Sequence, residues 1–190
     1  MKPLKIVYII RTFKTGGAEK LLLHWIQYIN ANQSLKIECR LVIWQKDSIE
    51  LAKQLPVNVV KIFNIWQWNG IAGFLQLRRW LKKYCPDIVH SHLPASGLLS
   101  LLIKKSGIKF CSIYSEHSLV NRKGFSFRLH GLCYHYHNSI HFVSHQVKQI
   151  VDESRNYRYS SFLLLPNVVP PQGYGRLGIS LQNNRLVIGT

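Results

Sequence analysis

The stretch LKIVYIIRTFKTGGAEKLLLHWI, residues 4–26, decides the fold because it predicts a strand, a turn and a helix in direct succession. Residues 4–10 form an apolar run typical of a buried strand. Gly16 and Gly17 supply a turn with a permissive backbone, and we expect Thr15 to be the N-cap of the helix. One apolar stripe at helical spacing indicates the helix, with members Ala18, Leu21, Leu22, Trp25, Ile26 and Ile29.

The double glycine admits two interpretations. A helix N-terminus, with its free N–H groups and the positive end of the helix dipole, is a site for an anion such as a phosphate or carboxylate. The alternative is a tight turn with nothing bound. The patterns GxGxxG and GxxxxGK[ST] are both absent, so neither a dinucleotide fingerprint nor a Walker loop is present. The stretch by itself leaves both interpretations open.

Short runs rich in Val, Ile and Tyr alternate with helix-length periodic segments along the chain. The sequence predicts strands at 4–10, 36–44, 58–63, 87–91, 109–114, 139–144 and 161–165. It predicts helices at 17–30, 47–55, 70–84, 94–106, 124–137 and 145–154. This alternation is typical of a parallel sheet covered on both faces, so we predict a doubly wound, Rossmann-like α/β fold.

The end of the chain has a different composition. Residues 165–184 contain three prolines and three glycines and lack a sustained period. We therefore predict one Rossmann-like domain at 1–165, an interdomain linker at 166–184, and the first strand of a further domain at 185–190.

Positive charge is the unusual bulk property. The chain has 25 Lys and Arg against eight Asp and Glu, a formal net charge of +17 with histidine neutral. Between residues 88 and 151 the only carboxylate is Glu116, among seven Lys and Arg and eight of the nine histidines. Such a field favours an anionic partner, namely an acidic membrane surface, a nucleic acid or a phosphorylated substrate.

No apolar run approaches the ~20 residues of a membrane-spanning helix, and the N-terminus lacks the features of a secretory signal. The four cysteines are widely spread with no CxxC pair, which favours reduced thiols. We therefore expect a cytoplasmic protein.

Six stretches, taken in order, resemble the N-terminal half of a GT-B-fold glycosyltransferase of the large retaining family 4. They are TGGAEKLLLHW (15–25), CPDIVHSHLPASGLLSLLIKKSG (85–107), SEHS (115–118), FVSHQVKQIV (142–151), LLPNVV (164–169) and NNRLVIGT (183–190). Their order and spacing carry the resemblance.

The resemblance implies an N-terminal domain that binds the acceptor and a C-terminal domain that holds most of the nucleotide-sugar. Gly16 and Gly17 match the loop whose amides approach the donor diphosphate, and His117 matches a cleft histidine near the reacting centre. It implies retaining, metal-independent transfer to a glycan or lipid-linked acceptor, as in polysaccharide or lipopolysaccharide biosynthesis. The nucleotide-sugar is then a co-substrate, and no cofactor is expected.

The family's nucleotide-binding Arg and Lys and its paired glutamates belong to the C-terminal domain and have no counterpart in residues 1–190. We therefore expect this chain alone to have little or no transferase activity. A separately encoded C-terminal half is one expected partner, and a truncated gene is the alternative.

The histidines near the predicted strand ends carry the candidate site. We expect His117 to act in catalysis and Glu116 to orient it or to contact the acceptor, the alternative being a structural histidine. His92 is expected to line the acceptor cleft, whereas His90 is expected to pack. No cysteine or carboxylate supports His90 and His92 at metal-ligand spacing, so no metal site is expected.

A second function class is a non-catalytic basic module that binds anionic lipid or nucleic acid. In the segment 121–137, aromatic and basic residues alternate without a clean buried stripe, and we expect Arg122, Lys123 and Arg128 to meet an anionic membrane surface. Peripheral attachment on the inner face of the membrane fits a lipid-linked acceptor. Motifs for specific nucleic-acid binding are absent.

Overall fold

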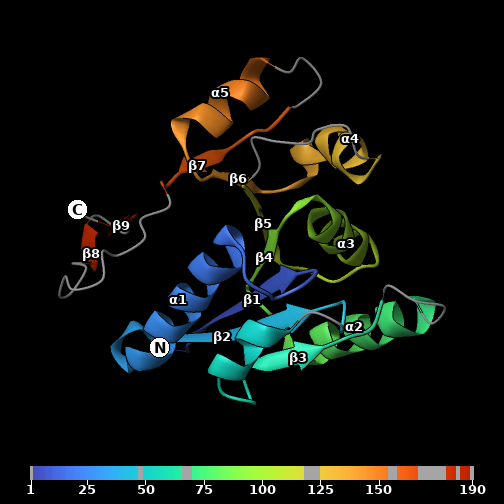
Figure 1. Cartoon of the computed structure of the whole chain (residues 1–190), viewed down its shortest axis with the longest axis vertical. Helices are drawn as coiled ribbons and strands as arrows, with labels where there is room; N and C mark the ends of the chain where they lie inside the picture. The colour runs from blue at the N-terminus through green and yellow to red at the C-terminus, as the bar shows by residue number, and fades with distance from the viewer. Residues whose placement is uncertain are drawn as a thin grey trace.

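Seven parallel strands form the central sheet of the computed structural model (Figure 1). They are β1 (Leu4–Ile10), β2 (Ile37–Ile43), β3 (Val60–Ile62), β4 (Ile88–His92), β5 (Cys111–Glu116), β6 (Ser139–Phe142) and β7 (Phe162–Leu164). Their order is β3-β2-β1-β4-β5-β6-β7, and each neighbouring pair is parallel. Because the strand order reverses at β1, the sheet is doubly wound, and the predicted fold class is confirmed.

The structure describes residues 2–46, 49–65, 70–117, 125–153, 158–166, 179–182 and 185–188. Five α-helices lie within these ranges: α1 (Gly17–Ala31), α2 (Gly70–Tyr84), α3 (Pro94–Lys105), α4 (Phe125–Leu132) and α5 (His145–Glu153). Three short 3₁₀ helices join them: η1 (Gln33–Leu35), η2 (Glu50–Gln54) and η3 (Tyr134–Tyr136). None of the described helices is long and apolar enough to cross a bilayer.

Two predicted helices differ from the structure. The helix expected at 47–55 is only the 3₁₀ helix η2, and Leu55 is already extended because the residue before a proline, here Pro56, disfavours the α conformation. The helix expected at 124–137 is α4 followed by η3. The change of helix type after Leu132 accompanies the burial of Tyr134, which is 1% exposed.

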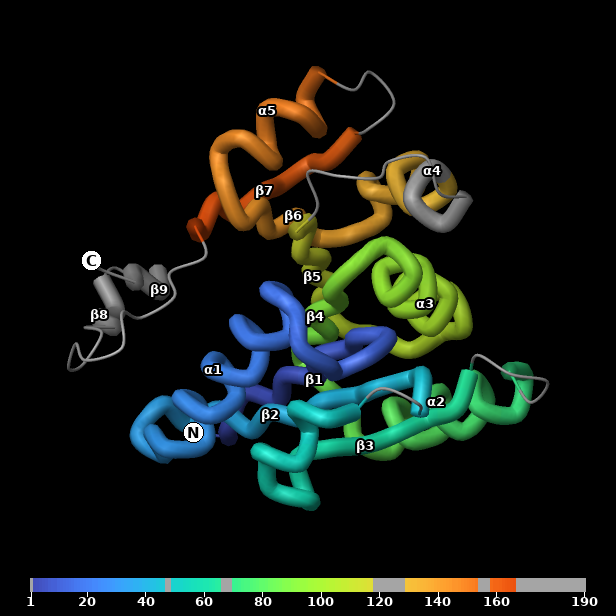
Figure 2. The backbone as a smooth tube through the Cα atoms, in the orientation of Figure 1, coloured from blue at the N-terminus to red at the C-terminus, as the bar shows by residue number. Residues whose placement is uncertain are grey.

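The side chains of β1 point alternately to the two faces of the sheet, and this divides the core into two parts. Tyr8 and Ile10 pack with residues of α1, and this side is called the α1 face. Val7 and Ile9 pack with residues of α2 and α3, and this side is called the α3 face. Figure 2 shows α1 on one side of the strands and α2, α3 and α4 on the other. The period of two along each strand therefore decides which helix layer a side chain meets.

The strands β8 (Ile179–Gln182) and β9 (Arg185–Ile188) form an antiparallel pair of their own. Strand β8 falls inside the segment 166–184, for which we expected a linker without regular structure. Strand β9 falls inside the predicted strand 185–190. The division of the chain into domains stays a prediction.

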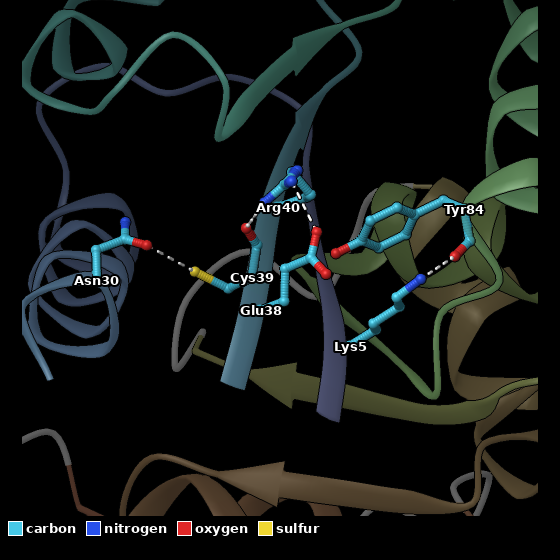
Figure 3. Close-up of polar contacts among 6 residues, drawn as sticks. All are labelled: Lys5, Asn30, Glu38, Cys39, Arg40 and Tyr84. Carbon is cyan, nitrogen blue, oxygen red and sulfur yellow. Dashed lines mark hydrogen bonds and ion pairs between the residues drawn. The ribbon is translucent and has the colours of Figure 1, made fainter. Parts of the chain in front are cut away.

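Polar contacts join β1, β2 and α2 at the edge of the sheet where the strands begin (Figure 3). Lys5 Nζ donates to the Tyr84 carbonyl at 3.2 Å and lies 5.0 Å from the centre of the Tyr84 ring. Arg40 forms an ion pair with Glu38 at 2.7 Å and donates to the Cys39 carbonyl at 3.0 Å. The Lys5 contacts hold the C-terminus of α2 against β1, at the edge opposite the strand ends that carry the predicted site.

A buried polar network occupies the α3 face beneath α3 and α4. Ser112 Oγ lies 2.8 Å from His137 Nδ1, and His137 Nε2 lies 3.0 Å from His130 Nε2. The His130 ring meets Tyr114 edge to face at 4.1 Å between centroids. Burial lowers the pKa of His137 to about 3, with the nearby Lys104 acting in the same direction, so this imidazole is neutral at pH 7.

Gly97 on α3 leaves the space that His130 fills. A Cβ at position 97 would lie 2.1 Å from His130 Nε2, a contact that this buried ring has no room to relieve. We predict that Gly97→Ala lowers the free energy of unfolding by about 1–3 kcal/mol in urea denaturation, despite the better helix propensity of alanine. Gly17→Ala is the matched control, because a Cβ there meets nothing within 4 Å. Equal stability of both variants would show that His130 is free to move.

The neutral state of His137 predicts acid sensitivity. The unfolded chain takes up a proton below pH ~6.5 while folded His137 does not, so this contribution to stability is present at pH 7 and is lost as the pH falls. One such histidine costs about 2 kcal/mol between pH 7 and pH 5. We predict that His137→Gln loses about 2 kcal/mol less than the wild type over this interval, as measured by urea denaturation at both pH values. His135→Gln, at an exposed position of η3, should keep the wild-type difference.

Candidate active site

The elements predicted to carry the site end at one edge of the sheet. Strands β1, β4 and β5 are parallel neighbours, so their carboxyl ends lie together. His92 ends β4, Glu116 ends β5, and Gly16 and Gly17 follow β1 at the start of α1. Ligands bind at this edge in open α/β sheets, where the switch in strand order leaves a crevice.

His92 and His117 form a hydrogen-bonded pair at this edge. His92 Nδ1 lies 2.9 Å from His117 Nε2, and the ring centroids are 5.2 Å apart. His92 is completely buried, whereas His117 keeps part of its surface exposed. The other two ring nitrogens, His92 Nε2 and His117 Nδ1, are buried without a hydrogen-bond partner in the described part of the chain.

Burial keeps both imidazoles of this pair neutral. It lowers the pKa of His117 to about 3, with His141 contributing, and it holds the pKa of His92 well below its usual range, with His90 next in importance. Each neutral ring carries one N–H. One of these donates within the pair, so whichever tautomers are present, the pair has one free N–H donor and one free nitrogen acceptor.

Aromatic rings enclose the pair from the α1 face. The His90 ring is stacked on His92 with centroids 4.5 Å apart. Trp25 of α1 lies 6.0 Å from His90, 6.2 Å from His92 and 5.8 Å from His141 between centroids. Helix α1 thus extends from the glycine turn to the histidines, and its tryptophan covers rings from β4 and β6.

Glu116 does not share a face with His117. Its carboxylate is completely buried on the α3 face and accepts hydrogen bonds from the hydroxyls of Tyr114 and Tyr134. Neighbouring residues of a strand point to opposite faces, which separates this carboxylate from the adjacent imidazole. The expected contact of Glu116 with an acceptor stays a prediction, and the carboxylate has no exposed surface through which to make one.

The glycine turn holds a carboxylate of the chain itself. Gly16, not Thr15, is the N-cap of α1, and no side chain caps the helix, so the expected role of Thr15 is wrong. A Cβ on Gly16 would lie 2.3 Å from Oε2 of Glu19, which shows how closely this carboxylate approaches the turn. Burial raises the pKa of Glu19, opposed by a hydrogen bond from its own backbone N–H and by Lys14. The positive end of the helix is therefore already close to a negative group.

The remaining candidates are placed as follows. His90 packs between Tyr8, Trp25 and His92, at 9% exposure. Among the described residues, no three His, Cys, Asp or Glu side chains form a group that could hold a metal ion. Arg122, Lys123 and the side chain of Arg128 lie outside the described residues, so the structure does not bear on their expected membrane contact.

Three residues of this site escaped the sequence interpretation. The sequence predicts Trp25 only as a member of an apolar stripe, Ser115 occurs only within the matched stretch SEHS, and no role is expected for His141. The pairing register places His92 beside Ser115 and Ser115 beside His141, so all three share a face. Strand register is a long-range property that local patterns do not specify.

Three solved proteins, two of them named as glycosyltransferases, share this fold. The lipopolysaccharide outer core galactosyltransferase WaaB, in its apo form, has a TM-score of 0.67 and 21% identity over 87% of this chain and 46% of its own. HepE (Alr3699) of Anabaena, solved with UDP and glucose, has a TM-score of 0.65 and 13% identity over 86% of this chain and 44% of its own. A glycosyltransferase of Rickettsia africae has a TM-score of 0.65 and 19% identity over 87% of this chain and 43% of its own.

The chain spans less than half the length of each of these three proteins. At such identities the likeness concerns the fold alone. A search of curated proteins gave no match.

Family membership comes from the sequence itself. The sequence model of glycosyltransferase family 4 matches residues 15–172, a span that begins just before the double glycine and ends beyond β7. It includes the histidine pair and every strand of the sheet after β1. The chain belongs to glycosyltransferase family 4.

Proposed function

We propose that this chain supplies the acceptor-binding half of a cleft for sugar transfer. The reaction is transfer of a sugar from a nucleotide-sugar to a glycan or a lipid-linked acceptor, with retention of configuration. The His92–His117 pair carries the proposal, because it lies at the carboxyl edge of the sheet with two buried nitrogens that have no partner in the described chain. Buried polar groups without partners are uncommon and call for a ligand or water.

A neutral imidazole pair suits a sugar hydroxyl. A hydroxyl group both donates and accepts a hydrogen bond, and the pair has one free group of each kind. A charged imidazolium would offer only donors. We assign His117 the role of contacting the sugar near the reacting centre. His92 holds His117 in position, and the acceptor contacts the same pair.

The donor side of the proposal concerns the glycine turn. HepE was solved with UDP and glucose, which supports a nucleotide-sugar as the co-substrate here. The amides of Gly16 and Gly17 would face the diphosphate and stabilise its charge as the sugar leaves. Glu19 would first have to rotate away, because its carboxylate lies against Gly16 and repels a diphosphate. Donor binding is thus coupled to a movement of this side chain.

We predict that His117→Ala slows sugar transfer at least about 100-fold, the usual loss when a polar contact to the transition state is removed. The assay uses residues 1–165 fused to the C-terminal half of HepE, with UDP-glucose and a panel of glycan and lipid-linked acceptors. Released UDP gives the rate, and proton NMR of the product gives its anomeric configuration. The unfused chain should release little or no UDP.

His24→Ala is the matched control, because His24 lies on α1 with its side chain exposed. It should leave the rate unchanged. Transfer at the wild-type rate by His117→Ala would contradict the role of this residue. A product of inverted configuration would contradict retention, and rapid turnover by the unfused chain would contradict the assignment of a half-site.

We also propose that the outer surface of α3 and η3 contacts an anionic membrane surface. A groove of about 430 Å³ runs between α3 and η3, lined by Leu98, Leu101, Leu102, Lys104, Lys105, Cys133, His135 and Tyr136. Leu102 is 57% and Tyr136 51% exposed, and Lys105 Nζ lies 5.5 Å from the Tyr136 ring centre. Between residues 88 and 151 the only carboxylate is the buried Glu116. Exposed apolar groups with an entirely basic rim match an acidic lipid surface.

We predict that Leu102→Ser combined with Tyr136→Ser weakens binding to phosphatidylglycerol vesicles at least about 10-fold, because two apolar anchors are lost. Co-sedimentation at low salt gives the partition coefficient. Val57→Ser combined with Phe162→Ser removes two exposed apolar groups away from the groove and should change little. Equal losses of vesicle binding in both double variants would contradict a specific membrane-binding surface at the groove. Equally tight binding to single-stranded RNA, abolished by salt, would favour the non-catalytic basic module.

A further inference from the structure

A chain of hydrogen bonds crosses three strands on the α1 face. His141 Nε2 on β6 lies 3.1 Å from the carbonyl oxygen of Leu165, just after β7. His141 Nδ1 lies 2.7 Å from Ser115 Oγ on β5, and Ser115 Oγ lies 2.7 Å from His90 Nε2 on β4. The proposed role of the His92–His117 pair makes no use of these groups.

The carbonyl of Leu165 sets the donor–acceptor direction of each of these three hydrogen bonds. A carbonyl only accepts, so His141 must carry its proton on Nε2. Burial lowers the pKa of His141, so the ring is neutral and its Nδ1 accepts. The single hydroxyl proton of Ser115 is then donated to His141, and Ser115 accepts from His90. His90 must therefore carry its proton on Nε2.

This series of hydrogen bonds ends at His90, next to the histidine pair. The His90 ring is stacked on His92 at 4.5 Å between centroids, and His92 is bonded to His117. Trp25 lies against His90, His92 and His141, which restricts rotation of all three rings. Fixing His90 thus fixes the surface on which His92 rests.

We infer that Ser115 and His141 are positioning residues that connect the end of β7, at Leu165, to the His92–His117 pair. The inference rests on the proposed function only for the role of that pair. Leu165 also donates its N–H to the Phe142 carbonyl at 3.1 Å, so two bonds hold it beside β6. The site is in this way sensitive to the position of the chain where it leaves the sheet.

The positions of His141, Ser115 and His90 also allow a second state, in which the two hydrogen bonds of Ser115 are reversed and the bond from His141 to Leu165 is lost. If the Leu165 carbonyl moves away, His141 is free to carry its proton on Nδ1 and to donate to Ser115. Ser115 then donates to His90 Nε2, and His90 carries its proton on Nδ1. A displacement at the end of β7 is therefore expressed as a change of tautomer beside His92, without a change in net charge.

Nitrogen-15 NMR of the histidine-labelled full chain at neutral pH tests this inference, because the protonated and unprotonated nitrogens of a neutral imidazole give separate resonances. The expected wild-type result is an N–H at Nε2 in both His90 and His141. In Ser115→Ala, His141 should keep this tautomer, whereas the ring resonances of His90, His92 and His117 should all shift. Ser115→Thr retains the hydroxyl and should restore them.

Ser112→Ala is the matched control. It removes the corresponding serine–histidine bond from the α3 face of the same strand, so only the resonances of His137 and His130 should shift. A wild-type N–H at Nδ1 of His90 overturns the inference, and this result does not require any variant to fold. Resonances of His92 and His117 that shift no more in Ser115→Ala than in Ser112→Ala also overturn it. The measurement uses neither donor nor acceptor, so its failure is distinct from a failure of sugar transfer.

Discussion

The register of β4, β5 and β6 is the constraint on which the rest of the site depends. In this register His92 lies beside Ser115, and Ser115 lies beside His141. A slip of one residue in β5 would turn Ser115 to the other face and bring Glu116 among the histidines. The parallel arrangement also places all these strand ends at one edge, where His117 meets His92. A change in a helix cap or a turn would leave these groups in place, whereas a change of strand register would displace them.

Strand β5 serves two different purposes through its two faces. Ser115 and His117 belong to the α1 face, where buried nitrogens lack a partner in the described chain. Ser112, Tyr114 and Glu116 belong to the α3 face, where hydrogen bonds from tyrosine and histidine side chains satisfy them. On the α3 face His130 Nδ1 is also buried without a partner in the described chain, but it lies inside a structural network beneath α3 and α4. The two unpartnered nitrogens of the α1 face lie at the carboxyl edge of the sheet, and this position gives that face the properties of a binding site. Adjacent residues of one strand, Glu116 and His117, have different environments for this reason.

Burial decides the chemistry of the histidines more than their neighbours do. Desolvation is the largest cause of the lowered pKa of His90, His92, His117, His130, His137 and His141. A strongly positive chain would gain still more charge if these rings were protonated. Keeping them neutral lets each ring both donate and accept, which a hydrogen-bond chain and a hydroxyl ligand both require.

The sequence by itself determined the seven strands of the central sheet, most helices and the α/β class, because periods of 2 and 3.6 and the glycine and proline signals are local. It also placed His92 and His117 near strand ends. Only the tertiary structure decided that these two imidazoles bond to each other, that Glu116 faces the opposite layer, and that Trp25, Ser115 and His141 join the site. These outcomes depend on strand register and on which helix covers which face. Both are set by contacts between residues far apart in the chain, which no local pattern records.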